Sequence, residues 1–215
     1  MKSKDLVYQK YAEISTLTIG SILAVVLLLV RIKLTGSYFL LFLGWNLFLA
    51  LIPFAIALLL YKHPVIMAKP VYRTVISFVW LLFLPNAPYV LTDFVHLHLS
   101  SLKLVVFDTI LIAFFAVTSF LSGIYSLRIF QEFYRIFYAD GIVRFMTCAV
   151  ALLCGYGVYL GRFIRLNSWD VFTHPKTTFI LIIRGLEHPL AWLVTLIFGM
   201  LIFITTTRWG TRINK

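Results

Sequence analysis

Six runs of predominantly apolar residues divide this chain, and each is about as long as a helix that crosses a bilayer. Such a helix needs about 20 residues, because a rise of about 1.5 Å per residue must cover a hydrocarbon core of about 30 Å. The runs occupy residues 14–30, 37–60, 75–91, 104–124, 145–163 and 189–207. Because backbone groups in lipid must bond within the protein, the chain is predicted to be an all-α, polytopic transmembrane bundle. We expect one integral membrane domain over residues 1–215.

The composition agrees with a chain whose main solvent is lipid. Hydrophobic residues make up 61% of the sequence and charged residues only 13%, against about 25% charged in a typical soluble domain. The net charge of +11 could indicate nucleic-acid binding, but Lys and Arg lie in short segments between the apolar runs. This placement is typical of the loops of a membrane protein. We therefore expect membrane lipids as partners and no nucleic acid.

Lys and Arg are distributed unevenly between the two alternating sets of connecting segments. The set that includes both ends of the chain holds 12 of these residues, and the other set holds 7. The positive-inside rule assigns the richer set to the cytoplasm, so both termini are predicted to be cytoplasmic. This orientation places two polar stretches, residues 85–96 and 161–170, near the outer face of the membrane.

Pro85 and Pro88 flank Asn86 inside the third apolar run. Proline removes a backbone donor and disfavours helical geometry in the preceding residue, so the third helix is predicted to be broken at Pro85/Pro88. A broken helix in a membrane protein often lines a cavity. The alternative is a simple helix end at the outer interface.

Four ionisable residues near the predicted outer face are candidates for catalysis. Asp93 and His96 are three residues apart and would share one face of a helix, which suits an acid/base pair or a divalent metal site. Asp108 and Asp170 could complete an oxygen-rich set of metal ligands. For Asp108, which follows an apolar stretch, a structural ion pair with Arg162 or Arg165 weighs equally, because an acid at membrane depth needs a partner.

Two arginines are candidates for binding an anion. Arg162 and Arg165 are three residues apart, and two adjacent guanidinium groups suit a phosphate or carboxylate. The alternative is that the arginines extend toward lipid headgroups, or that they neutralise the nearby acids and so exclude a metal. The candidate substrate-binding residues are Asn46, Asn86, Arg162, Arg165 and Asn167.

Three stretches of the sequence together resemble an uncharacterised bacterial membrane family, catalogued as domain of unknown function 1361. They are residues 45–53 (WNLFLALIP), residues 80–97 (WLLFLPNAPY followed by TD and HL), and residues 161–170 (GRF, R and NSWD). The resemblance implies a multi-pass protein of a bacterial cytoplasmic membrane. It brings no activity with it, so any mechanism must come from the residues.

Three classes of function fit these observations. The first is a hydrolase or transferase that acts on a lipid-linked or phosphate-bearing envelope substrate at an outward-facing polar pocket. The second is a transporter or an ion- or anion-binding membrane subunit. The third is a non-catalytic structural partner whose polar groups only join helices. Complete pairing of the polar groups without a cavity would favour the third class.

Overall fold

Long apolar helices make up most of the computed structural model, which describes residues 10–62 and 69–210 and contains no strand in these ranges. The long helices are α2 (Tyr11–Thr35), α3 (Phe42–Lys62), α5 (Pro70–Phe83), α7 (Val105–Tyr134), α8 (Asp140–Tyr159) and α11 (Pro189–Gly210). The shorter elements are α6 (Asn86–Tyr89), the 3₁₀-helix η1 (Val90–Leu99), the π-helix η2 (Leu160–Ile164), α9 (Asp170–Thr173) and α10 (Pro175–Gly185). The all-α prediction is confirmed.

Six candidate membrane spans occur in the described part of the chain, as predicted. They are Tyr11–Thr35, Phe42–Leu60, Pro70–Leu99, Val105–Tyr134, Asp140–Ile164 and Pro189–Thr207. The protein is therefore a multi-pass membrane protein. The third and fourth spans are longer than the apolar runs predicted, at 30 residues each. The third continues past residue 91 because η1 keeps a helical form and packs against α7, so Asp93 lies inside a span and not in an outer loop.

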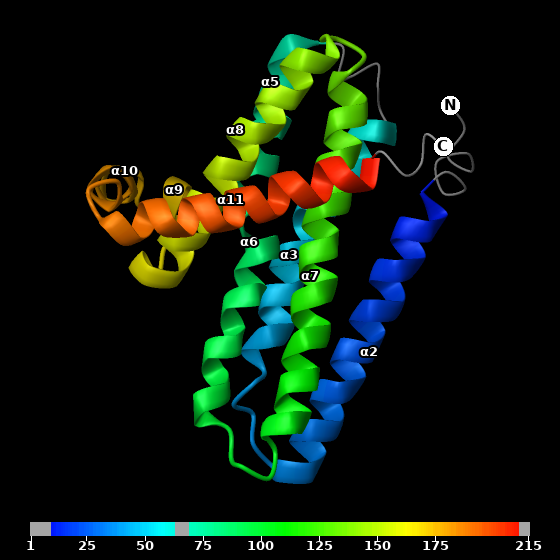
Figure 1. Cartoon of the computed structure of the whole chain (residues 1–215), viewed down its shortest axis with the longest axis vertical. Coiled ribbons are helices and arrows are strands. Elements are labelled where there is room, and N and C mark those ends of the chain that lie inside the picture. The colour runs from blue at the N-terminus through cyan, green and yellow to red at the C-terminus, as the bar shows by residue number, and fades with distance from the viewer. Residues whose placement is uncertain (1–9, 63–68, 211–215) are drawn as a thin grey trace.

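Helix α7 is the centre of the bundle. Figure 1 shows it running almost the full length of the molecule, and it packs against α2, α3, α6 and η1. Its buried serines bond to the backbone of α3, at a proline and at the residue three positions before it. Ser122 donates to the Ala50 carbonyl at 2.8 Å, and Ser126 donates to the Pro53 carbonyl at 2.8 Å. These bonds hold α3, and with it one side of the candidate site, against α7.

The third span is interrupted at its prolines, as predicted. Helix α5 ends at Phe83 and α6 begins at Asn86, while Leu84 and Pro85 between them keep right-handed helical dihedral angles. The prolines thus interrupt the pattern of hydrogen bonds more than the path of the chain. Beyond α6 the chain continues as the narrower η1, which rises about 2 Å per residue.

Glycines on α8 let two other segments approach closely. A Cβ added to Gly155 would lie 2.5 Å from the Thr195 carbonyl oxygen of α11, and one added to Gly157 would clash with the ring of Pro85. Figure 1 shows α11 lying across the bundle in front of α8. The contact at Pro85 brings the end of α8 to the interrupted part of the third span, and this meeting builds the candidate site.

Candidate functional site

Asp93 is the centre of the polar cluster and has no solvent-exposed surface. The side-chain amide of Asn46 on α3 donates to its Oδ2 at 2.9 Å, and the guanidinium of Arg162 on η2 donates to its Oδ1 at 3.3 Å. The arginine also lies over the ring of Tyr89, with 5.9 Å between the guanidinium carbon and the ring centroid. Three spans therefore meet at one carboxylate, and the Asp93–Arg162 pair joins the two polar stretches of the sequence, whereas Asp108, which was expected to meet an arginine of the second stretch, lies elsewhere.

His96 is one turn of η1 away from this carboxylate. Its Nδ1 lies 3.1 Å from the backbone carbonyl oxygen of Asp93 and 3.9 Å from Oδ1 of the same residue. The ring packs on Phe42, with 4.8 Å between centroids. The tautomer with a proton on Nδ1 donates to the carbonyl and leaves Nε2 as an acceptor. An imidazole held in this way is suited to accept a proton from a bound group.

A cavity of about 690 Å³ joins these residues. All five predicted substrate-binding residues line it, namely Asn46, Asn86, Arg162, Arg165 and Asn167. Of the four predicted catalytic residues, Asp93 and His96 line it, while Asp108 and Asp170 are not among its lining residues. The remaining lining is mainly aliphatic and aromatic, with Leu81 and Leu82 from α5 and Leu153 from α8. Volume and lining of this kind are typical of a binding site for a small or amphiphilic ligand.

The segment after α8 shapes one wall of the cavity. It runs from the π-helix η2, a form that is frequent at functional sites, through Arg165, which has a left-handed backbone with φ of 64°, to Ser168. Few non-glycine residues adopt this conformation. The side-chain amide of Asn86 donates to the Ser168 hydroxyl at 2.9 Å and so ties the segment to α6. Among the described residues, Arg165 has no acidic partner within 4.0 Å.

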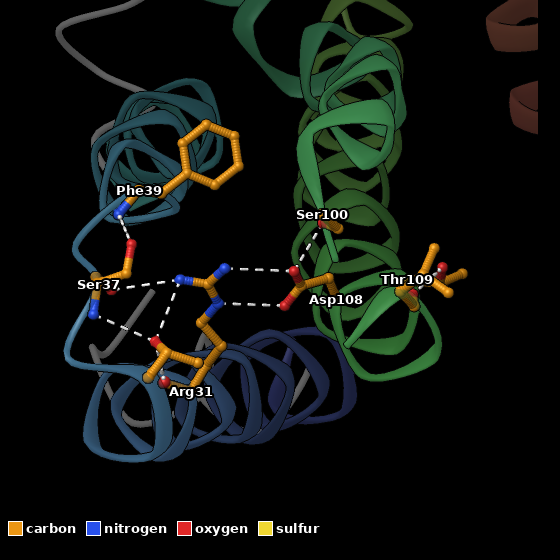
Figure 2. Close-up of polar contacts among 8 residues, drawn as sticks. Arg31, Ser37, Phe39, Ser100, Asp108 and Thr109 are labelled. Carbon is orange, nitrogen blue, oxygen red and sulfur yellow. Dashed lines mark hydrogen bonds and ion pairs between the residues drawn. The ribbon is translucent and has the colours of Figure 1, made fainter. Parts of the chain in front are cut away.

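The predicted pairing of Asp108 with Arg162 or Arg165 is wrong. Asp108 pairs with Arg31 of α2, whose Nε and NH2 lie 3.2 Å from Oδ1 and 3.4 Å from Oδ2 (Figure 2). The Ser100 hydroxyl also donates to Oδ2, at 2.7 Å. Sequence reasoning missed Arg31 because the first apolar run ended at residue 30, whereas α2 continues to Thr35 and carries this side chain into the bundle.

The predicted four-residue metal set does not assemble. Asp170 accepts hydrogen bonds from the backbone N–H and the side-chain amide of Asn167, at 2.7 and 3.3 Å, and so closes a turn. Asp108 belongs to the separate pair with Arg31. Within residues 10–62 and 69–210, no three His, Cys, Asp or Glu side chains are grouped as ligands of one metal ion. The pairing of Arg162 with Asp93 matches the alternative in which the arginines neutralise the acids.

The chain belongs to the family described as a protein of unknown function, DUF1361, whose model matches residues 45–205. The match confirms the resemblance seen in the sequence and extends it from residue 170 almost to the end of α11. It includes every residue that lines the 690 Å³ cavity except Phe42, and it leaves out Arg31. No curated protein and no solved structure matches the chain.

Proposed function

We propose that this protein is a membrane-embedded hydrolase or transferase that acts on a phosphate-bearing substrate in the 690 Å³ cavity. One observation carries the proposal: the same cavity is lined by two guanidinium groups and by an imidazole whose Nδ1 is fixed by a backbone carbonyl. A purely structural role would need no such cavity beside the polar cluster. The metal that the sequence suggested is not part of the proposal.

The balance of charge supports an anionic substrate. Arg162 is neutralised by Asp93, but Arg165 has no acidic partner within 4.0 Å among the described residues, so the cavity carries a surplus of positive charge. The amide of Asn167, which donates one hydrogen to Asp170, also lines the cavity and has a second hydrogen to donate. Guanidinium groups bind phosphate with paired, charge-assisted hydrogen bonds. We expect Arg165 to make the first contact, because it is exposed and free to turn toward the anion.

His96 is the group we assign to proton transfer. Its Nε2 takes the proton of a water molecule or of an acceptor hydroxyl while that oxygen forms a bond to phosphorus. The bond from phosphorus to the leaving oxygen breaks, and the proton passes to that oxygen. The carboxylate of Asp93, 3.9 Å from Nδ1, stabilises the imidazolium that forms between these steps. Arg162 holds this carboxylate in place from the other side.

The location that we propose is a bacterial cytoplasmic membrane, with both termini in the cytoplasm and the cavity in the outer half. The uneven distribution of Lys and Arg supports this orientation. Reporter domains fused after Ser101 and after Lys176 should both report the outside. A cytoplasmic signal at Ser101 would reverse the orientation and would exclude an envelope substrate that is reached from outside.

The test of function uses the purified full chain in lipid nanodiscs. Phosphatidic acid and a polyprenyl diphosphate are supplied in turn, and released phosphate and new lipid products are measured by mass spectrometry. Turnover that is lost in His96→Gln while binding remains would support the proposal. Binding without turnover in the wild-type protein would favour the second class, an anion-binding or transport subunit, because the same arginines serve that role. The absence of both would overturn the proposal.

A further inference from the structure

A second cavity, of about 270 Å³, lies between α5, α7 and α8 and is almost entirely apolar. Phe78 and Leu81 of α5 face Met146 and Val150 of α8 across it. Phe78 is also half exposed, so this cavity opens toward the surface that the bilayer covers.

The polar groups around this second cavity are already bonded to one another. The hydroxyls of Ser77 and Tyr134 are 2.7 Å apart, and the Gln131 amide donates to Thr147 at 2.9 Å. The indole N–H of Trp80 donates to Ser126 at 2.6 Å. A ligand here would therefore meet hydrocarbon surface and few free donors or acceptors, which suits an aliphatic chain.

The two cavities adjoin one another between α5 and α8, and we call this stretch the crevice. Leu81 lines both of them. On α8, Val150 lines the second cavity and Leu153 lines the first, and residues three apart on a helix lie on the same face. A ligand that extends from the polar cavity along α5 would therefore pass Leu81 and enter the apolar cavity.

The crevice is long enough to hold much of a lipid chain. From Pro85, which lines the polar cavity, to Thr74, which lines the apolar cavity, α5 and its continuation cover about 16 Å at a rise of about 1.5 Å per residue. Half of a hydrocarbon core of about 30 Å is about 15 Å. A lipid chain whose headgroup lies in the polar cavity can thus run the length of the crevice, toward the ends of α5 and α8 that the proposed orientation places at the cytoplasmic side.

We propose that the substrate is an anionic amphiphile whose phosphate headgroup occupies the cavity around Arg162 and Arg165 and whose hydrocarbon chain occupies the crevice between α5 and α8. This inference rests on the proposed function and defines its substrate class. The apolar crevice selects long-chain substrates, and the arginines select the charge of the headgroup. Inorganic phosphate and short-chain phosphates lack the chain and bind weakly.

The test compares three lipids on the full chain in detergent micelles: dioleoyl phosphatidic acid, dihexanoyl phosphatidic acid and dioleoylglycerol. We expect Val150→Trp, which fills the apolar cavity, to weaken binding of the dioleoyl phosphatidic acid by about tenfold, since the displacement of two methylene groups has about that effect. Binding of the dihexanoyl lipid should not change. Val75→Trp is the matched control, because Val75 is an exposed valine of α5 that lines neither cavity.

The outcomes separate the two proposals. Equal affinity of wild type for the two phosphatidic acids would overturn the chain-binding inference and leave the proposed function standing. Equal affinity for dioleoyl phosphatidic acid and dioleoylglycerol would overturn the anionic headgroup, and with it the proposed function. A diazirine at the chain end of phosphatidic acid provides a second readout that needs no variant. It should label Phe78, Met146 or Val150, and labelling confined to α2 and α11 would contradict the inference.

Discussion

Asp93 and Asp108 are two fully buried aspartates of the same bundle, and each is paired with an arginine. Arg31 closes around Asp108 and is itself buried, with only 6% of its side chain exposed. Arg162 beside Asp93 is 18% exposed and lines a cavity together with His96. The same chemical pair is therefore closed in at one junction and lines a cavity at the other. What distinguishes the two is the surrounding space, not the identity of the pair.

Position along the bundle also separates the two aspartates. Asp93 lies within η1, and the Ser100 that bonds Asp108 follows the end of that helix. The six steps from Asp93 to Leu99 cover about 12 Å at a rise of about 2 Å per residue of 3₁₀-helix. The Asp108 junction joins the α2–α3 turn to the segment between η1 and α7 (Figure 2), and Figure 1 shows these connections at one end of the molecule. The Asp93 cluster lies further inside, where α6 meets the end of α8.

The largest expected effect is the loss of stability when the buried Arg31–Asp108 pair is broken. Asp108→Ala leaves the guanidinium of Arg31 buried without a counter-charge, which typically destabilises a protein by about 3–5 kcal/mol. Thermal unfolding in detergent measures the change. The double variant Arg31→Leu, Asp108→Leu removes both charges and should recover most of the lost stability. A double variant as unstable as the single one would show that the pair does more than neutralise charge.

The two aspartates show which features could be predicted from the sequence and which could not. The spans were predictable because apolar runs of bilayer length have few other uses. The meeting of Asp93 with Arg162 was predictable because a charge at membrane depth needs a partner. The partner of Asp108 was not, because the choice between Arg31, Arg162 and Arg165 depends on how helices rotate and slide against one another. Spacing within one helix does not determine that arrangement.

The local backbone around the site was predictable only in part. The prolines predicted the interruption of the third span, but not that the chain would continue as a 3₁₀-helix that keeps Asp93 within a candidate membrane span. The π-helix and the left-handed Arg165 have no signal in a single sequence. These backbone features bring Arg162 to Asp93 and leave Arg165 exposed at the cavity. The shape of the site could not be predicted because it depends on how α6 and α8 pack against each other.

The second effect concerns turnover, which should depend on His96 beside Asp93 and not on the Asp108 junction. His96→Gln removes the proposed proton acceptor and should lower turnover by about 100-fold, the usual contribution of a general base. Binding of dioleoyl phosphatidic acid should change little. The matched control is Ser100→Ala, which removes a hydroxyl bonded to Asp108 and should leave turnover unchanged. Equal losses in the two variants would assign the effect to the fold and not to proton transfer.

The third effect concerns Asn46, which donates a hydrogen bond to Asp93 of the Asp93–Arg162 pair. Asn46→Ala removes the amide that donates to Oδ2 of Asp93, and a hydrogen bond to a charged group contributes about 1.5–3 kcal/mol. We expect a loss near 2 kcal/mol in the free energy of unfolding, smaller than that of Asp108→Ala, because water in the cavity can replace the lost donor. Chemical denaturation of both variants in the same detergent gives the comparison. A loss of stability in Asn46→Ala as large as that in Asp108→Ala would mean that water is excluded from the Asp93 cluster as fully as from the Asp108 junction.

The smallest effect is the most specific, because it predicts a gain at one aspartate and no change at the other. Asp93→Asn removes the charge that neutralises Arg162 but keeps the shape of the side chain, so the cavity becomes more positive. Affinity for dihexanoyl phosphatidic acid should rise by about threefold to tenfold, which is the attraction of one additional charge at several ångströms in a partly solvated site. Asp108→Asn should leave this affinity unchanged, because its partner Arg31 does not line the cavity. Calorimetric titration of the two variants measures these affinities. An unchanged or weaker affinity in Asp93→Asn would mean that Arg162 binds no anion and only pairs with the carboxylate of Asp93.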